Sequence, residues 1–167
     1  MDERELLRGQ FKATRENLDR TIADCTPEVA DKTDDAWTIN KIGSLYAHVV
    51  LGEDMMIGGM GKGGETVFKN GGWEERLGIS SVALRQDEEL ASLTIHLEVF
   101  REYAEAVGTA TDEFLANATD EQLEKKIGVS QMPLIEILAN IGVPHMAEDW
   151  GEIAALKGVQ GLKGLPF

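Results

Sequence analysis

The stretch His145–Ile153, HMAEDWGEI, places metal-capable side chains where the last helical segment of the chain should be apolar. Residues four apart lie above one another on one face of a helix. On this spacing one inward-facing stripe of side chains starts with apolar residues, continues with a histidine and an aspartate, and ends with an apolar residue. The stripe consists of Leu134, Leu138, Ile141, His145, Asp149 and Leu156. A buried carboxylate is unfavourable unless it is paired, hydrogen-bonded or bound to a metal. The stripe therefore predicts a partner for Asp149.

Helical periodicity extends over most of the chain. Apolar residues recur at helical spacing in four long segments, at about 3–24, 39–57, 88–116 and 133–157. Thr38 and Asp87 are expected to cap the second and third segments, because short polar side chains accept hydrogen bonds from free N–H groups at a helix start. Thr26-Pro27 predicts a short helix at 27–31, and Thr119–Gln122 reads as a capping box before another.

A glycine-rich stretch, Gly58–Gly72, interrupts the helical pattern. The span 58–88 is interpreted as a long crossover between the second and third long helices, attached to the rest of the fold by Trp73 and Leu77. The predicted fold class is therefore all-α, a four-helix bundle with a long crossover between helices two and three. Short connections are expected to place helix one beside helix two and helix three beside helix four.

Composition limits the function classes. The chain has 167 residues, with 16 Lys plus Arg against 30 Asp plus Glu, and a net charge of −14. We expect a single domain, 1–167, that binds neither nucleic acid nor anionic membranes, because phosphate binding requires clustered cations. Cys25 is the only cysteine, which excludes an intrachain disulfide and a cysteine-rich zinc cluster. With no signal-peptide pattern at Met1–Glu5 and no membrane-length apolar run, a cytoplasmic location is expected.

His48, His145 and Asp149 are the candidate metal ligands. His48 lies beside the apolar face of the second helix, and His145 and Asp149 share a face of the last helix. Two imidazoles and one carboxylate on one side of an ion form a facial triad, which leaves positions open for water or substrate. This donor set suits Zn, Ni or Fe(II) better than Ca or Mg.

Other interpretations of these residues stay open. An inward histidine is often part of a core, and Asp149 could instead pair with a lysine, an arginine or a protonated histidine. A ferritin-like di-iron site is disfavoured, because no histidine here has a glutamate three residues before it. His96 is interpreted as a core or boundary residue. Glu53, Glu148 and Glu152 are the nearby acids, and Glu152 is the candidate to orient a ligand.

Two segments resemble a known family. Ile42–Asp54, IGSLYAHVVLGED, looks like the second-helix signature of the DinB-like superfamily. His145–Gly158 resembles the last-helix signature of that family, His-x-x-x-His-x-Gly-Glu-Ile, and Gly161–Phe167 fits the same pattern. The resemblance implies an up-down-down-up four-helix bundle, a homodimer, and a divalent metal held by three histidines. His48 and His145 match two of these ligands, and Asp149 stands where the family usually has the third histidine.

The resemblance also implies a class of activity. Members of the family include thiol-dependent transferases and a maleylpyruvate isomerase that uses mycothiol, in which the metal activates a low-molecular-weight thiol. The first hypothesis is therefore a metal-dependent thiol S-transferase acting on a small-molecule substrate. The alternative is a non-catalytic helical bundle that acts as a dimer or binds a small ligand, with a metal site that has decayed at Asp149.

Overall fold

The computed structural model describes residues 2–80 and 92–167. Within them the fold is all-α, as the periodicity predicts. The described strands, β1 (Lys126–Ile127) and β2 (Met132–Pro133), form a small antiparallel hairpin. No helix in these two ranges is both long enough and apolar enough to cross a membrane.

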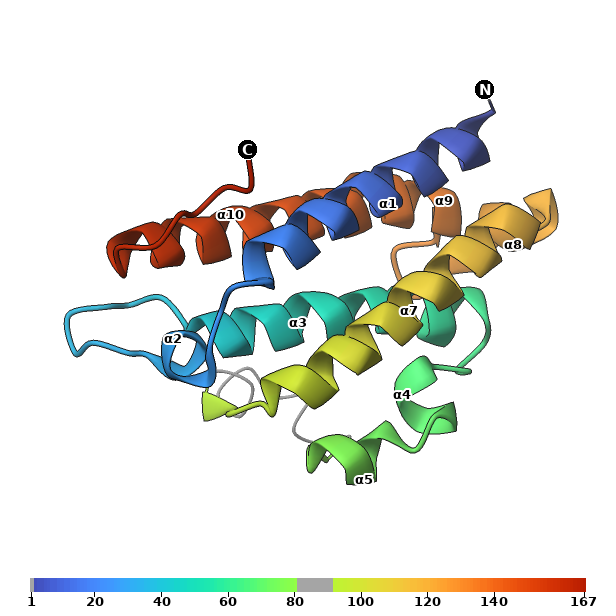
Figure 1. The fold of residues 1–167 in the computed structure, drawn as a ribbon. Coiled ribbons are helices and arrows are strands. Elements are labelled where there is room, and N and C mark those ends of the chain that lie inside the picture. Colours follow the sequence, from blue (N-terminus) through green and yellow to red (C-terminus); the bar gives the residue numbers. More distant parts are fainter. Residues whose placement is uncertain (1, 81–91) are drawn as a thin grey trace.

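Four long helices dominate the described residues (Figure 1): α1 (Glu3–Ile22), α3 (Ile42–Asp54), α7 (Leu97–Asn117) and α10 (Val143–Val159). The chain runs along α1 and α10 in one direction and along α3 and α7 in the other. Both α1 and α3 pack against α7 and α10. The core between them contains buried apolar residues from all four, including Phe11, Val50, Phe100 and Met146.

The predicted neighbours among these helices are wrong. No comparably extensive packing joins α1 to α3, or α7 to α10, in the described chain. The connection after α1 includes α2 (Pro27–Asp31) and the non-helical segment 32–41, so it is long enough to cross the end of the helices. Helix α3, the second long helix, therefore lies diagonally opposite α1, and both contact α10.

Several shorter helices complete the described chain. Helices α2 and α8 (Asp120–Glu124) start at the predicted caps Thr26 and Thr119, and the capping box is present. Two others, α4 (Val67–Asn70) and α5 (Trp73–Leu77), form inside the crossover, where none was predicted. Thr66 starts α4 by accepting a hydrogen bond from the Lys69 backbone N–H.

The starts of the second and third long helices differ from the prediction. Helix α3 begins at Ile42 with Lys41 as its N-cap, not at Thr38. The predicted cap Asp87 lies outside the described residues, and residues 93–96 are not helical, so α7 begins only at Leu97. The Ser44 hydroxyl donates to the Leu93 carbonyl oxygen, which takes the place of a helical hydrogen bond there.

The last helical segment is continuous but changes its winding. It begins as α9 (Leu134–Ile137), passes through the π-helical segment η3 (Leu138–Gly142) and continues as α10. A π-helical turn holds more residues than an α-turn, so it rotates the following side chains relative to the preceding ones. The predicted stripe is wrong at Ile141, which is 49% exposed. The π-turn thus fixes the orientation of α10 immediately before His145.

The glycine-rich crossover is attached to the long helices by a buried carboxylate. A second π-helical segment, η1 (Met55–Gly61), follows α3. Just before it, Asp54 accepts hydrogen bonds from the backbone N–H groups of Val67 and Phe68, both at 2.8 Å, and from the Tyr103 hydroxyl at 2.7 Å. The side chains of Trp73 and Leu77 are buried in the core cluster, which confirms that both residues attach the crossover.

Gly58 supplies a test of this attachment. A Cβ atom at Gly58 would lie 2.6 Å from Thr66 Cα and 2.8 Å from the Glu65 carbonyl oxygen, so the backbone would have to move. We expect Gly58→Ala to lower the free energy of unfolding by about 1–3 kcal/mol in urea denaturation. Gly9→Ala is the matched control, because Gly9 lies exposed within α1 with nothing within 4 Å of its added Cβ. It should raise stability by about 0.5–1 kcal/mol. Equal effects of the two substitutions would contradict the close packing at Gly58.

Candidate metal centre

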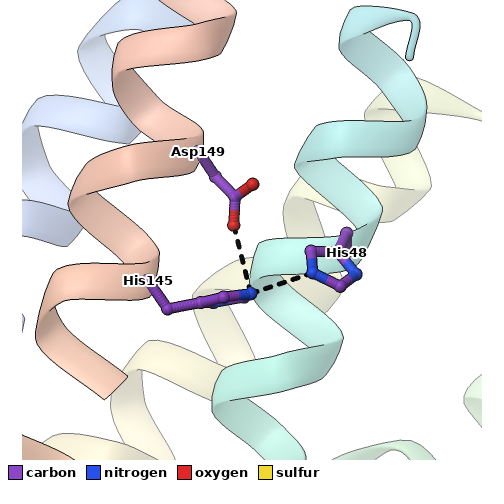
Figure 2. A group of neighbouring side chains, drawn as sticks. All are labelled: His48, His145 and Asp149. Carbon is purple, nitrogen blue, oxygen red and sulfur yellow. Dashed lines mark hydrogen bonds and ion pairs between the residues drawn. The ribbon is translucent and has the colours of Figure 1, made fainter. Parts of the chain in front are cut away.

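The three predicted ligands come together between α3 and α10. Figure 2 shows His48 projecting from α3, and His145 and Asp149 projecting from α10 toward it. One donor atom from each residue lies within 4.8 Å of the other two. The Nε2 atoms of the two histidines are 2.8 Å apart, and His145 Nε2 is 3.4 Å from Asp149 Oδ2. His145 therefore stands between the other two side chains.

Local structure explains this convergence. His145 and Asp149 are four residues apart on one helix, so they share the face that η3 turns toward α3. On α3, Gly52 lies four residues after His48 and has no side chain to obstruct the second imidazole. A Cβ atom at Gly52 would lie only 3.3 Å from His145 Cε1. Gly52 is not predicted from the sequence, because its role depends on the packing of two helices that are distant in the chain.

The two imidazoles constrain each other's protonation. A nitrogen–nitrogen distance of 2.8 Å is a hydrogen bond only if one Nε2 carries a proton and the other accepts it. Two unprotonated Nε2 atoms would instead point two lone pairs at the same place, which is favourable only if a cation lies there. The same geometry thus serves either a shared proton or a metal ion.

Asp149 is the least compensated of the three side chains. It is 12% exposed, against 29% for His145, and its Oδ2 atom is buried without a hydrogen-bond partner among the described residues. Burial raises the pKa of Asp149, although positive charge on His145 or His48 would lower that pKa. Glu148 and Glu152 reinforce the increase by like-charge repulsion. Among the described residues, Asp149 lies within ion-pair distance of His145 and of no lysine or arginine, so of the alternative pairings the one with a protonated histidine stays open.

The donor set fits a divalent transition metal. Ligand bonds of about 2.0–2.1 Å place adjacent ligand atoms about 2.8–3.4 Å apart on one ion, for angles between a right angle and the tetrahedral angle. The separations of 2.8 and 3.4 Å at His145 Nε2 are close to this range. An unpaired carboxylate oxygen beside two imidazole nitrogens is a combination that Zn, Ni and Fe(II) accept. His48, His145 and Asp149 would hold the ion.

The other candidate residues lie elsewhere. His96 is exposed at the N-cap of α7, so its interpretation as a core or boundary residue is wrong, because this helix starts about nine residues later than predicted. Glu53 is buried away from the histidines, where it pairs with Arg15 and accepts from the Thr111 hydroxyl at 2.6 Å. Glu152 is exposed and makes no hydrogen bond to either histidine within the described ranges.

Comparisons with known proteins place the chain in no family: no protein-family model matches it, and neither does any curated protein. The resemblance to the DinB-like superfamily therefore stays a prediction from the sequence. The argument for a metal centre rests on the converging donor atoms of three side chains.

Asp149 gives a prediction for the metal-free protein. Because burial raises the pKa of Asp149, the folded chain holds this proton more tightly than the unfolded chain, and ionisation opposes folding. This loss of stability is absent below the pKa of an aspartate in the unfolded chain, about 3.9, and is complete above the pKa of Asp149 in the folded chain. At pH 7 with EDTA, Asp149→Asn should therefore raise the free energy of unfolding by about 1 kcal/mol.

The difference in the free energy of unfolding between Asp149→Asn and the wild type should become smaller as the pH is lowered toward 4. Urea denaturation at several pH values, with EDTA throughout, measures it. Glu148→Gln is the control, because Glu148 is exposed one residue away and should show no such pH-dependent gain. A destabilised Asp149→Asn protein at pH 7 would mean that the carboxylate is already well compensated without metal.

Proposed function

We propose that this protein binds one divalent transition metal ion, Zn, Ni or Fe(II), at His48, His145 and Asp149. The supporting observation is the approach of His145 Nε2 to both His48 Nε2 and Asp149 Oδ2, which brings two neutral donors and one anionic donor to a common point. The Asp149 Oδ2 atom, buried without a hydrogen-bond partner among the described residues, adds a reason for a cation, because a metal ion would compensate its charge.

We infer in addition a DinB-like architecture, an up-down-down-up four-helix bundle that forms a homodimer. The two segments that resemble the family signatures coincide with α3 and α10, the helices that carry the three donor side chains. The packing of α1 and α3 against both α7 and α10 supports a bundle. Asp149 replaces the usual third histidine, and it gives the site one negative charge that three imidazoles would not supply.

For the activity we propose a thiol-dependent S-transferase. Three ligands on one side of an ion leave other positions open, and the partly exposed His145 side chain puts the site within reach of solvent. A bound metal would supply a Lewis acid that lowers the pKa of a low-molecular-weight thiol. The chain itself would contribute two imidazole nitrogens, a carboxylate oxygen and the rigid α3–α10 contact that holds them. The acceptor would be a small electrophilic molecule.

A second candidate is a non-catalytic helical bundle that acts as a dimer or binds a small ligand. The observation in its favour is the 2.8 Å contact between the two Nε2 atoms, since a shared proton would satisfy both histidines without a metal. In this case Asp149 would mark a site that no longer binds an ion tightly. Metal binding therefore separates the two candidates.

Metal titration tests the first proposal. The purified protein, stripped with EDTA and dialysed, should bind one equivalent of Zn, Ni or Fe(II), measured by calorimetry and by elemental analysis after gel filtration. Removing one ligand should weaken binding at least about a hundredfold in His48→Ala and in His145→Ala, because even residues that only orient a ligand contribute up to this much.

His96→Ala is the matched control for these two variants. His96 is exposed and outside the cluster, so its removal should leave the stoichiometry and affinity unchanged. If the wild type retains no Zn, Ni, Fe or Mn after supplementation, or if His96→Ala loses as much affinity as His145→Ala, the proposed site is wrong.

Thiol turnover tests the proposed activity. The metal-loaded protein should consume a thiol from a panel of low-molecular-weight thiols when an electrophilic acceptor is present, with loss of free thiol as the measurement. His145→Ala should reduce the rate to that of the buffer. A protein that binds metal but gives no turnover across a broad panel would favour the non-catalytic candidate.

A further inference from the structure

A cleft lies on the other side of α3 from the candidate metal centre. It has a volume of about 970 Å³ and is lined mainly by residues of α1 and α7. Tyr46 and Glu53 line it from α3; they are seven residues apart and so share a helix face different from that of His48. Small-molecule sites have volumes of roughly 300–1,000 Å³, so the cleft is large enough for a ligand.

A buried arginine with unpaired donor groups lines this cleft. Arg15, on α1, is 7% exposed and forms an ion pair through Nη2 with Glu53, which is 1% exposed. The Thr111 hydroxyl holds the other oxygen of Glu53. The Nε and Nη1 groups of Arg15 are buried and have no hydrogen-bond partner among the described residues. A guanidinium group only donates, so these positions need an acceptor.

A second guanidinium group lies at this cleft. Arg101 also lines it, and this side chain donates to the backbone carbonyl oxygens of Ile22, Ala23 and Cys25, which carry no net charge. Of the acidic residues that line the cleft, Glu53 is the one that is fully buried, and it pairs with Arg15. Arg8 at the rim is already paired with Asp112.

The charge and the apolar lining of the cleft indicate which class of ligand it could bind. Four more acidic residues line the cleft, and each is exposed or half-buried: Glu16, Asp19, Glu105 and Glu113. Their negative charge disfavours anions with several charges, such as phosphates. Phe11, Ile22 and Leu115 give the cleft buried apolar walls. A singly charged ligand with an apolar body meets both conditions.

We propose that this cleft binds a small monocarboxylate with an apolar body. Its carboxylate accepts hydrogen bonds from Arg15, and its body lies against Phe11, Ile22 and Leu115. Glu53 competes with the ligand for the same guanidinium group and keeps the affinity moderate. The site is separate from the metal centre, so binding does not depend on a metal ion or on His145.

Octanoate and its neutral analogue octanamide are the probes, titrated into the full-length protein by calorimetry with EDTA present. Octanoate should bind at least about tenfold more tightly than octanamide, because hydrogen bonds to a charged group are stronger than those to a neutral one. Glu53→Gln removes the competing carboxylate and should tighten octanoate binding by about tenfold. The double variant Arg15→Met with Glu53→Gln should weaken octanoate binding at least about tenfold, without leaving an unpaired buried charge.

Two controls locate the effect. Arg20→Gln, an exposed change on α1 outside the cleft, should leave octanoate affinity unchanged, and so should His145→Ala. Circular dichroism confirms that each variant is folded. No octanoate binding to the wild type, equal binding of octanoate and octanamide, or weaker binding to Glu53→Gln would each overturn the proposal. Those results would mean that Arg15 has a structural role, with water on its free donors.

Discussion

The contact between α3 and α10 is the constraint on which the candidate function depends. It brings a carboxylate and an imidazole from the last helix against an imidazole from a helix almost a hundred residues earlier, with His145 Nε2 2.8 Å from His48 Nε2. Three features secure this contact: the π-helical turn before α10, the absence of a side chain at Gly52, and the four-residue spacing of His145 and Asp149.

The other buried charges show why Asp149 is distinctive. Asp54 accepts three hydrogen bonds, two from backbone N–H groups and one from Tyr103. Lys157, also buried, donates to the Thr21 carbonyl oxygen and pairs with Asp24. These charges are compensated by the fold, as buried charges must be. Asp149 and Arg15 differ in that each keeps a buried polar atom without a hydrogen-bond partner among the described residues, although Asp149 lies within ion-pair distance of His145 and Arg15 pairs with Glu53. Both proposals rest on the same physical argument, applied to opposite signs of charge.

The sequence predicted the features that depend on local spacing. Helical periodicity predicted the all-α class, the capping box at Thr119 and the shared face of His145 and Asp149. The approach of His48 to this pair followed from its place beside an apolar helix face. These features can be predicted from the geometry of one helix, or from the assumption that inward-facing side chains of two helices contact each other.

The errors concern features that depend on tertiary contacts. At the break at 93–96 the Leu93 carbonyl group accepts from Ser44, which is distant in sequence, and Ile141 is exposed in a π-turn that changes the phase of the helix. The neighbours of α1 depend on the path of a long connection. The pairing of Arg15 with Glu53 joins two helices, and residue spacing within either helix does not reveal it.

X-ray absorption spectroscopy of the protein loaded with one equivalent of Zn or Ni reads the metal ligands themselves. A metal centre at His48, His145 and Asp149 should give two imidazole ligands with metal–nitrogen distances of about 2.0–2.1 Å, oxygen ligands in the remaining positions and no sulfur in the thiol-free protein. In His48→Ala the spectrum should show one imidazole fewer. A spectrum with sulfur from Cys25, with no imidazole, or with an imidazole count that His48→Ala leaves unchanged would contradict a metal centre built from α3 and α10.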